Sequence, residues 1–221
     1  LGNGVSVGAG LEDINDGTTN LAGTAVGKIE YSGSGISAHI SGMATGVLDG
    51  TVNNYAMHAG FTGTFDAFKL RGAFAADDTG YWNGLATASA TFDMFTLAGT
   101  VEGVHYGSAT TGTVKDDTTD WGAGASLSAA VTDGVTLNVG GRWYHEEANA
   151  SLSNGKNDAW QIAASVSAAV TETVTLTGEV GAYGSDLLKS NIGDDQVYYG
   201  AVQAAWAPGG GFTSSIKGEA Y

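Results

Sequence analysis

The sequence of 221 residues contains no cysteine, one proline and only 8 lysines and arginines, against 23 aspartates and glutamates. The absence of cysteine excludes disulfide frameworks and thiolate metal sites. The formal net charge of −15 excludes a basic stripe that neutralises phosphates, so we expect no nucleic-acid partner. No run of 18 apolar residues occurs, and we therefore expect no transmembrane helix.

Glycine, by contrast, is abundant, with 36 residues. These glycines follow no G-X-Y repeat, so the chain is not collagen-like. Aromatic residues make up 10% of the chain and are spread along it, which argues against disorder. Charged residues reach only 14%, compared with about 25% in ordinary soluble domains.

The dominant pattern is an alternation of apolar and polar residues with a period of two, which predicts β-strands with two different faces. In residues 21–31, Leu21 and Ile29 lie on one face, and Lys28 and Glu30 lie on the other. About thirteen such segments of about 10 residues occur, and a tilted strand of that length crosses a bilayer. Short turns alternate with longer acidic connections, which predicts an all-β, antiparallel, up-and-down β-barrel that spans a membrane.

The short turns also predict which residues face each other across a hairpin. We expect a four-residue turn at 32–35 and a two-residue turn at 66–67. The cross-strand pairs expected from these turns are Lys28 with His39, Thr62 with Arg71, and Thr64 with Lys69.

Two weak internal repeats lie at the short turns. Residues 64–70 (TFDAFKL) match 91–97 (TFDMFTL), and residues 129–137 match 168–176. Each repeat is one hairpin used twice, and nothing indicates a domain boundary. We therefore expect a single β-barrel domain over residues 1–221. An open edge in hydrocarbon leaves polar groups unsatisfied, and bacterial barrels have even strand numbers, so thirteen strands indicate an incomplete barrel or a miscount.

The charges indicate which solvent each face meets. We expect the nine charged residues within strands to lie on the polar face, because a basic residue facing lipid costs roughly 2–4 kcal/mol at the bilayer midplane. The rest of that face is mostly Ser, Thr, Ala and Gly, which suits enclosed water better than the outer face of a soluble sandwich. Aromatic residues gather near both strand ends, as in the interfacial girdles of outer-membrane barrels. The expected pore-lining residues are Lys28, Glu30, His39, His58, Lys69, Arg71, Glu102, Arg142, Glu179, Lys217 and Glu219.

Three segments of the chain resemble the general porins of alpha-proteobacteria: LGNGVSVGAGLED (1–13), WQIAASVSAAVTETVTLTGEVGAY (160–183) and VYYGAVQAAWAPGGGFTSSIKGEAY (197–221). The resemblance implies a sixteen-stranded, trimeric porin in the outer membrane of a Gram-negative bacterium, in contact with outer-membrane lipid and lipopolysaccharide. Such porins end on a terminal Phe and carry a long constriction loop, whereas this chain ends at Tyr221 and shows no such loop. The resemblance thus implies a later portion of a porin that lacks strands at both ends.

The expected function is passive diffusion of ions and small hydrophilic solutes through a water-filled channel, without a catalytic step. The five bases and four acids of the polar face leave little overall ion preference, and Lys69 with Arg71 is the strongest candidate for a local field. We expect no enzyme activity and no catalytic residue, since no G-x-S-x-G motif occurs and the four histidines have no close spacing in sequence. Two alternatives remain: a structural or adhesive outer-membrane barrel with a blocked lumen and partner-binding loops, and a soluble all-β binding module.

No cofactor is expected. The acidic loops offer hard oxygen ligands on one rim, suited to a divalent cation such as Ca²⁺ that bridges to lipopolysaccharide or to a neighbouring subunit. The favoured interpretation is a solvated acidic rim without a metal. The candidate ligands in these loops are Asp116, Asp117, Asp194 and Asp195.

Overall fold

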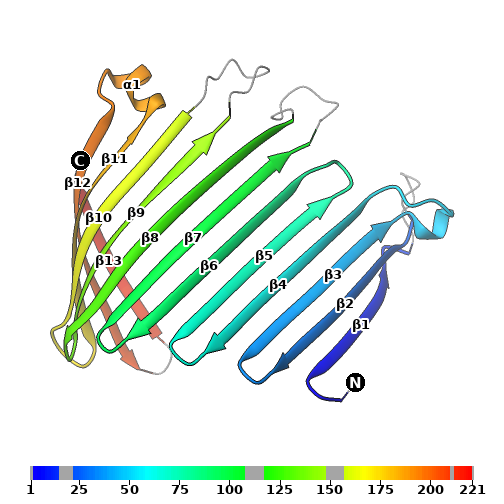
Figure 1. Ribbon diagram of the computed structural model, residues 1–221, viewed down its shortest axis with the longest axis horizontal. Helices are drawn as coiled ribbons and strands as arrows, with labels where there is room; N and C mark the ends of the chain where they lie inside the picture. The colour runs from blue at the N-terminus through cyan, green and yellow to red at the C-terminus, as the bar shows by residue number, and fades with distance from the viewer. Residues whose placement is uncertain (1, 15–21, 108–116, 148–156, 210–211, 221) are drawn as a thin grey trace. The chain divides into compact units, whose positions relative to one another are not determined.

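The computed structural model describes residues 2–14, 22–107, 117–147, 157–209 and 212–220. Thirteen antiparallel strands form one sheet, in which each strand pairs with its neighbour in sequence (Figure 1). The strands are β1 (Val5–Glu12), β2 (Thr24–Gly33), β3 (Ile36–Thr45), β4 (Tyr55–Phe65), β5 (Phe68–Asp77), β6 (Trp82–Phe92), β7 (Phe95–Tyr106), β8 (Thr118–Thr132), β9 (Val135–Glu146), β10 (Asn157–Ala169), β11 (Val174–Ser185), β12 (Gln196–Gly209) and β13 (Phe212–Ala220).

The predicted all-β, up-and-down arrangement of about thirteen strands is therefore confirmed. In the described part of the chain, β1 and β13 occupy the two ends of the strand order and the sheet does not close. Two short helices lie in connections between the described strands. They are the 3-10 helix η1 (Val47–Asp49) and the α-helix α1 (Asp186–Ile192). Within the described ranges, neither helix is long enough or apolar enough to cross a membrane.

The chain divides into two compact units, which are described separately below. Strands β1–β5 belong to unit 1 and strands β9–β13 belong to unit 2, while β6, β7 and β8 contribute residues to both. Unit 1 consists of Leu1–Ala88, Val101–Trp121 and Ala148–Gly155, and unit 2 consists of Ser89–Thr100, Gly122–Glu147 and Lys156–Tyr221.

The turn between β2 and β3 corrects one predicted pairing. Ser34 and Gly35 both have positive φ angles, 52° and 78°, so two residues suffice to reverse the chain. Such turns match the right-handed twist of the flanking strands, which lets both strands extend further into the hairpin. Lys28 consequently faces Ser41, and the predicted pairing of Lys28 with His39 is wrong by two residues.

The repeated turn sequences have the same backbone feature. Asp66 in 64–70 and Asp93 in 91–97 occupy equivalent positions, and their φ angles are 53° and 52°. Aspartate tolerates this left-handed conformation better than most residues, because its short polar side chain can hydrogen-bond locally. The predicted pairs Thr62 with Arg71 and Thr64 with Lys69 are confirmed.

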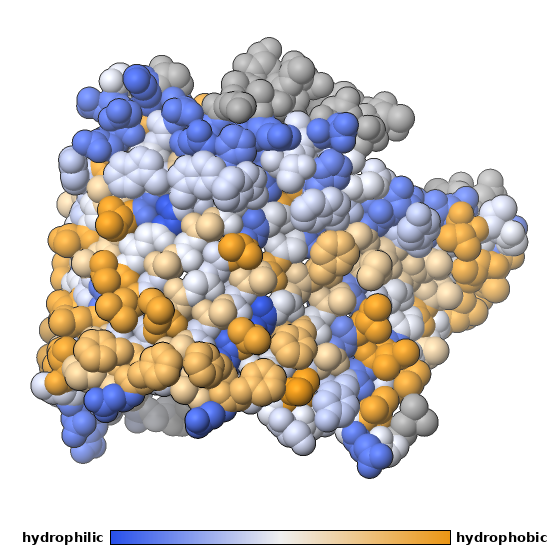
Figure 2. Space-filling model, in the orientation of Figure 1, coloured by the Kyte–Doolittle hydropathy of each residue, from blue (hydrophilic) through white to orange (hydrophobic). Residues whose placement is uncertain are grey.

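One face of each unit is apolar and exposed. In unit 1, Val7, Ile29, Ile40 and Ala59 lie in one row across neighbouring strands, and Ile29 is 52% exposed. Figure 2 shows hydrophobic residues gathered over the middle of the strands and hydrophilic residues gathered at their ends. A soluble sandwich would bury such a face against a second sheet.

Unit 2 repeats this apolar face with different residues. Leu176, Ala204 and Ile216 lie in one row, and Val202 and Ile216 are 69% and 75% exposed. Among the described residues, the buried hydrophobic side chains are only those of two alanines, Ala182 and Ala201. Each unit is thus a single layer of sheet without an apolar core of its own.

Aromatic side chains mark the ends of the strands on this apolar face. Phe65 and Phe68 face each other at the short turn of unit 1, and both are exposed. In unit 2, Trp143 and Trp160 face each other near the long connections. Aromatic residues therefore lie at a turn end in one unit and at a loop end in the other.

Five acids that the sequence pattern places in the longer acidic connections lie within strands: Glu12, Asp77, Asp120, Glu146 and Asp158. Strand β8 begins at Thr118 and includes Asp120, and β10 begins at Asn157 and includes Asp158. Asp158 faces His145 on the same side of the sheet as the tryptophan pair, so the expectation of an apolar face without charge is wrong at this strand end. The hydrogen bond of 2.6 Å between His145 Nδ1 and Asp158 Oδ1 accounts for the extended pairing.

Candidate functional site

The polar face of unit 1 carries most of the predicted pore-lining residues. Glu30 lies directly opposite His39, in a row that begins at Ser6. The Ser6 hydroxyl donates a hydrogen bond of 2.8 Å to Glu30 Oε1, and Lys28 Nζ lies 2.5 Å from Glu30 Oε2. The charge of Lys28 is therefore largely balanced by its neighbour two residues along β2.

A histidine pair lies beside this ion pair. His39 on β3 faces Gly60, and His58 on β4 faces Ser41, so the two histidines are diagonal neighbours across the β3–β4 pairing. Diagonal positions are about 7–8 Å apart in the backbone, within reach of side chains of this length. His39 Nε2 lies 2.9 Å from His58 Nδ1, and the ring centroids are 4.9 Å apart.

Gly60 makes room for the ring of His39. A Cβ atom placed on Gly60 would lie 2.4 Å from Cε1 of His39, which is closer than any real contact of this kind. The ring therefore lies over the backbone of the neighbouring strand, at the position where any other residue would project a side chain.

Lys69 and Arg71 occupy neighbouring positions on the polar face of β5. They face Thr64 and Thr62, and neither base forms an ion pair within the described part of the chain. Two like charges two residues apart on one strand do not neutralise each other, and water is the solvent that stabilises them. This geometry agrees with the interpretation of a local positive field.

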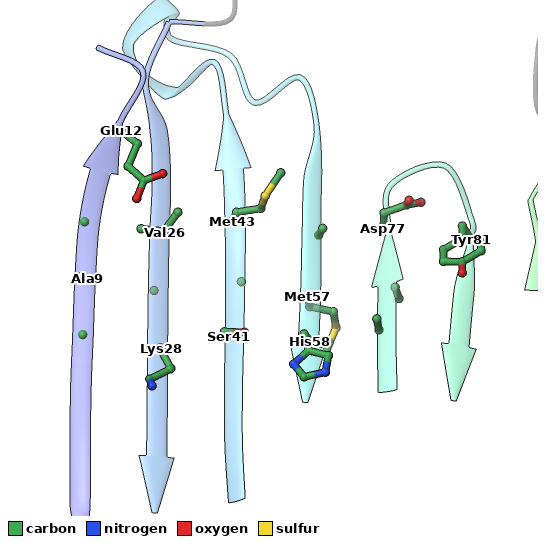
Figure 3. A pocket seen from close by; sticks show the side chains of 17 residues that line it. Ala9, Glu12, Val26, Lys28, Ser41, Met43, Met57, His58, Asp77 and Tyr81 are labelled. Carbon is green, nitrogen blue, oxygen red and sulfur yellow. The ribbon is translucent and has the colours of Figure 1, made fainter. Parts of the chain in front are cut away.

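A concave pocket of about 730 Å³ lies on the polar face of β1–β5 (Figure 3). Glu12 and Asp77 line it near the long connections, and Lys28 and His58 line it further along the strands. Met43 contributes apolar surface level with Asp77, in the row that runs from Val26 through Met43 and Ala56 to Asp77. The pocket thus presents acids and Met43 at one end and bases at the other.

The polar face of unit 2 relies more on neutral hydrogen bonds. Asn138 Nδ2 donates to Ser165 Oγ at 3.3 Å, and Ser167 shares a short hydrogen bond with Thr177. Lys217 and Glu219 form an ion pair on β13. These interactions satisfy polar groups and pair the charge of Lys217, whereas Arg142 and Glu179 form no ion pair within the described residues.

The remaining predicted pore-lining residues lie in separate places. Arg142 on β9 faces Gln161, whose Nε2 donates 2.9 Å to the hydroxyl of Tyr199. Glu179 on β11 faces Ser165. Glu102 is exposed on β7. The sheet therefore distributes these side chains over several strands and does not gather them at one centre.

The rim acids do not form a metal site among the described residues. Asp116 lies outside the described residues, and Asp117 Oδ1 lies 3.7 Å from Nε2 of His105. Asp194 and Asp195 lie between α1 and β12. No group of three or more histidine, aspartate or glutamate side chains capable of holding a metal ion occurs in the described ranges.

Sequence reasoning missed two features of the polar groups. The histidine pair joins residues 19 positions apart, and it becomes visible only when the pairing of β3 with β4 is known. Asp120 is 1% exposed, the most deeply buried side chain of the described chain, although its sequence context resembles an acidic loop. No family model matches the chain, and no curated protein matches it.

Proposed function

We propose that the chain forms part of an outer-membrane β-barrel that encloses a water-filled channel for ions and small hydrophilic solutes. The observation that carries this proposal is the exposed apolar face of each unit. The opposite face of the same sheet carries charged side chains. Apolar surface left in water is unfavourable by about 25 cal/mol per Å². Hydrocarbon removes that cost on one side, and enclosed water solvates the charges on the other.

The positions of the aromatic residues support a bilayer as the apolar solvent. Rings at strand ends match the headgroup level, where one edge of a ring meets lipid and the other meets water. The strands have 8 to 15 residues, which includes the 9–11 residues that cross a hydrocarbon core when tilted. These features favour an outer-membrane location over a soluble all-β binding module.

The mechanism in this proposal is size exclusion combined with the field of inward charges. Lys28 and Lys217 are each paired with an acid on the same strand, whereas Lys69 and Arg71 have no such partner in the described chain. A passing ion therefore meets a local positive field near β5. Solutes diffuse along the polar face, and this transport needs no bound cofactor.

The resemblance to the general porins of alpha-proteobacteria supports the same function. It also supports two further proposals. One is that the protein forms a homotrimer, and the other is that the rim formed by the long acidic loops contacts lipopolysaccharide. The exposed acids of the rim repel one another and anionic headgroups unless cations lie between them. The favoured interpretation of that rim is a solvated acidic surface without a bound metal.

Recordings in planar lipid bilayers test the proposal. Purified protein added at nanomolar concentration is expected to produce stepwise, ohmic conductance that rises in proportion to salt concentration. Insertion without conductance would favour a structural or adhesive barrel with a blocked lumen. Extraction of the protein from cells without detergent would contradict membrane insertion and favour the soluble module.

A further inference from the structure

The histidine pair on the polar face of unit 1 has a geometry that suits a metal ion. His39 Nε2 and His58 Nδ1 lie 2.9 Å apart, with the rings tilted by 33° to each other. His58 is exposed, His39 is half-buried, and His58 lines the pocket. Both nitrogens are therefore reachable from the open side of the sheet.

The 2.9 Å between the two nitrogens is the length of a hydrogen bond in the metal-free pair. Metal–imidazole bonds are about 2.0–2.1 Å long, so two nitrogens bound to one cation would be about 2.9 Å apart at a right angle and about 3.3 Å apart at a tetrahedral angle. Both spacings are close to the hydrogen-bonded one, so a small reorientation of the two rings lets them bind one cation. Square-planar or tetragonal nitrogen sites are typical of Cu²⁺ and Ni²⁺.

We propose that His39 and His58 form a two-histidine site for a divalent transition-metal cation, with Cu²⁺ bound most tightly. Imidazole suits this class of metal, and affinities for a given site rise toward Cu²⁺ along the first-row series. Water fills the other positions, since the described chain places no third histidine or carboxylate in a common cluster. This site does not depend on the proposed channel.

Binding needs a change of tautomer and a turn of both rings, because the facing nitrogens of a hydrogen-bonded pair do not point at a common cation. In the free pair, one ring nitrogen donates a hydrogen bond to the other. When the cation arrives, that hydrogen moves to the other nitrogen of the same ring, and both facing lone pairs bind the metal. No oxidation or reduction occurs in this step.

The neighbours of the pair favour a cation at this point. Glu30 lies directly opposite His39 and provides a negative charge beside the site, although Lys28 balances part of it. Gly60 acts as a positioning residue, because its missing side chain leaves the space that the ring of His39 occupies. The site thus depends on two ligands and on one glycine that places the first of them.

Copper titration of the tag-free chain in detergent micelles, followed by electron paramagnetic resonance, tests this inference. We expect one saturable Cu²⁺ site per chain, with hyperfine splitting from two nitrogens. His39→Gln and His58→Gln should each weaken binding by at least about 10-fold, a loss that even outer-shell changes produce. Zn²⁺ should compete poorly, because affinities for a given nitrogen site peak at Cu²⁺ along the first-row series.

Matched variants separate this site from general histidine binding. His105→Gln and His145→Gln change histidines that bond to Thr119 and Asp158, and they should leave the affinity unchanged. Gly60→Ala should weaken binding while both ligands remain. Copper binding that is unchanged in both His39→Gln and His58→Gln, or that is absent from the unmodified chain, would overturn the inference. The readout needs no conductance, so failure here leaves the channel proposal intact, and failure of conductance leaves this site intact.

Discussion

The two units use their polar faces differently, although their apolar faces are alike. In unit 1, β5 carries Lys69 and Arg71 without an ion-pair partner in the described chain, and a histidine pair lies on β3 and β4. In unit 2, hydroxyl and amide groups bond across neighbouring strands, and Lys217 is paired with Glu219. Arg142 and Glu179 of unit 2 also form no ion pair within the described residues, but they lie on separate strands, so the adjacent pair of like charges is a property of β5.

This difference indicates that the residues of the apolar face and those of the polar face meet different physical requirements. The apolar face needs only exposed aliphatic side chains, and Ile40 in unit 1 and Val202 in unit 2 are interchangeable in that respect. The polar face has to solvate or pair each charge, and the two units do so in different ways. Substitutions on the apolar faces should therefore have equal effects in both units, whereas charge removal on the polar faces should not.

Arginine on the apolar face is expected to have the largest effect. Ile40→Arg and Val202→Arg should each lower the free energy of unfolding in lipid vesicles by about 2–4 kcal/mol, because each places a charge near the middle of the hydrocarbon. Denaturant titration measures this change. The matched controls Ser41→Arg and Gln203→Arg lie one residue further along the same strands, on the polar face, and should cost far less. Equal costs on both faces would show that no bilayer covers the apolar side.

The next largest effect concerns a glycine of unit 2. A Cβ atom on Gly181 would lie 2.6 Å from the ring of Tyr199, so Gly181→Ala should displace that ring and lower the free energy of unfolding by about 1–3 kcal/mol. Gly178 on the same strand has open space, and Gly178→Ala should change stability by no more than about 0.5 kcal/mol. Thermal or denaturant unfolding distinguishes the two variants. A larger loss in the Gly178 variant would contradict the role assigned to the ring.

Charge removal sharpens the contrast between the polar faces. Each base at about 10 Å in water interacts with a passing ion by about 0.4 kcal/mol, so the double change Lys69→Gln, Arg71→Gln should favour cations by about fourfold and disfavour anions by about fourfold, which shifts the cation-to-anion permeability ratio by about 16-fold. Reversal potentials in asymmetric salt measure this ratio. The paired control Lys28→Gln, Glu30→Gln removes one charge of each sign and should shift the ratio little. A shift of equal size in the control would mean that ion pairing does not determine the field.

The smallest effect is expected at a turn of unit 1. Ser34 has a φ of 52°, a conformation that asparagine adopts more readily, and Asn-Gly is the preferred pair for this turn. Ser34→Asn should therefore raise the free energy of unfolding by about 0.5 kcal/mol. Ser37→Asn on the adjoining strand β3 provides the control and should give no gain in the same denaturant titration.

The sequence predicted the strands well because their signal is local. A period of two needs only neighbouring residues, and every strand pairs with the next one along the chain. Pairing registers depend on turn conformation, which is why 66–67 was predicted correctly and 32–35 was wrong by two residues. The ends of the strands were harder to predict. His145 and Asp158 extend the pairing of β9 with β10 into a stretch whose acidic sequence indicated a loop.

The sequence pattern predicted neither the helix α1 nor the histidine pair, for two different reasons. Ser185 caps α1 by accepting a hydrogen bond from the amide of Leu188, and Gly193 ends it with a φ of 83°. These caps are visible in sequence, yet a seven-residue helix is too short to show a helical period. The pairing of His39 with His58 depends on the register between β3 and β4, so an error in that register separates the two residues.

The strand order has a consequence for how such a chain can change in length. Because each strand bonds only to its sequence neighbours, inserting or deleting a whole hairpin leaves the direction of all other strands unchanged. The matching turns at Asp66 and Asp93 have the form that duplication of one hairpin would leave behind. The number of strands in the sheet is therefore a quantity that duplication of a hairpin can change in steps of two, without altering the path of the rest of the chain.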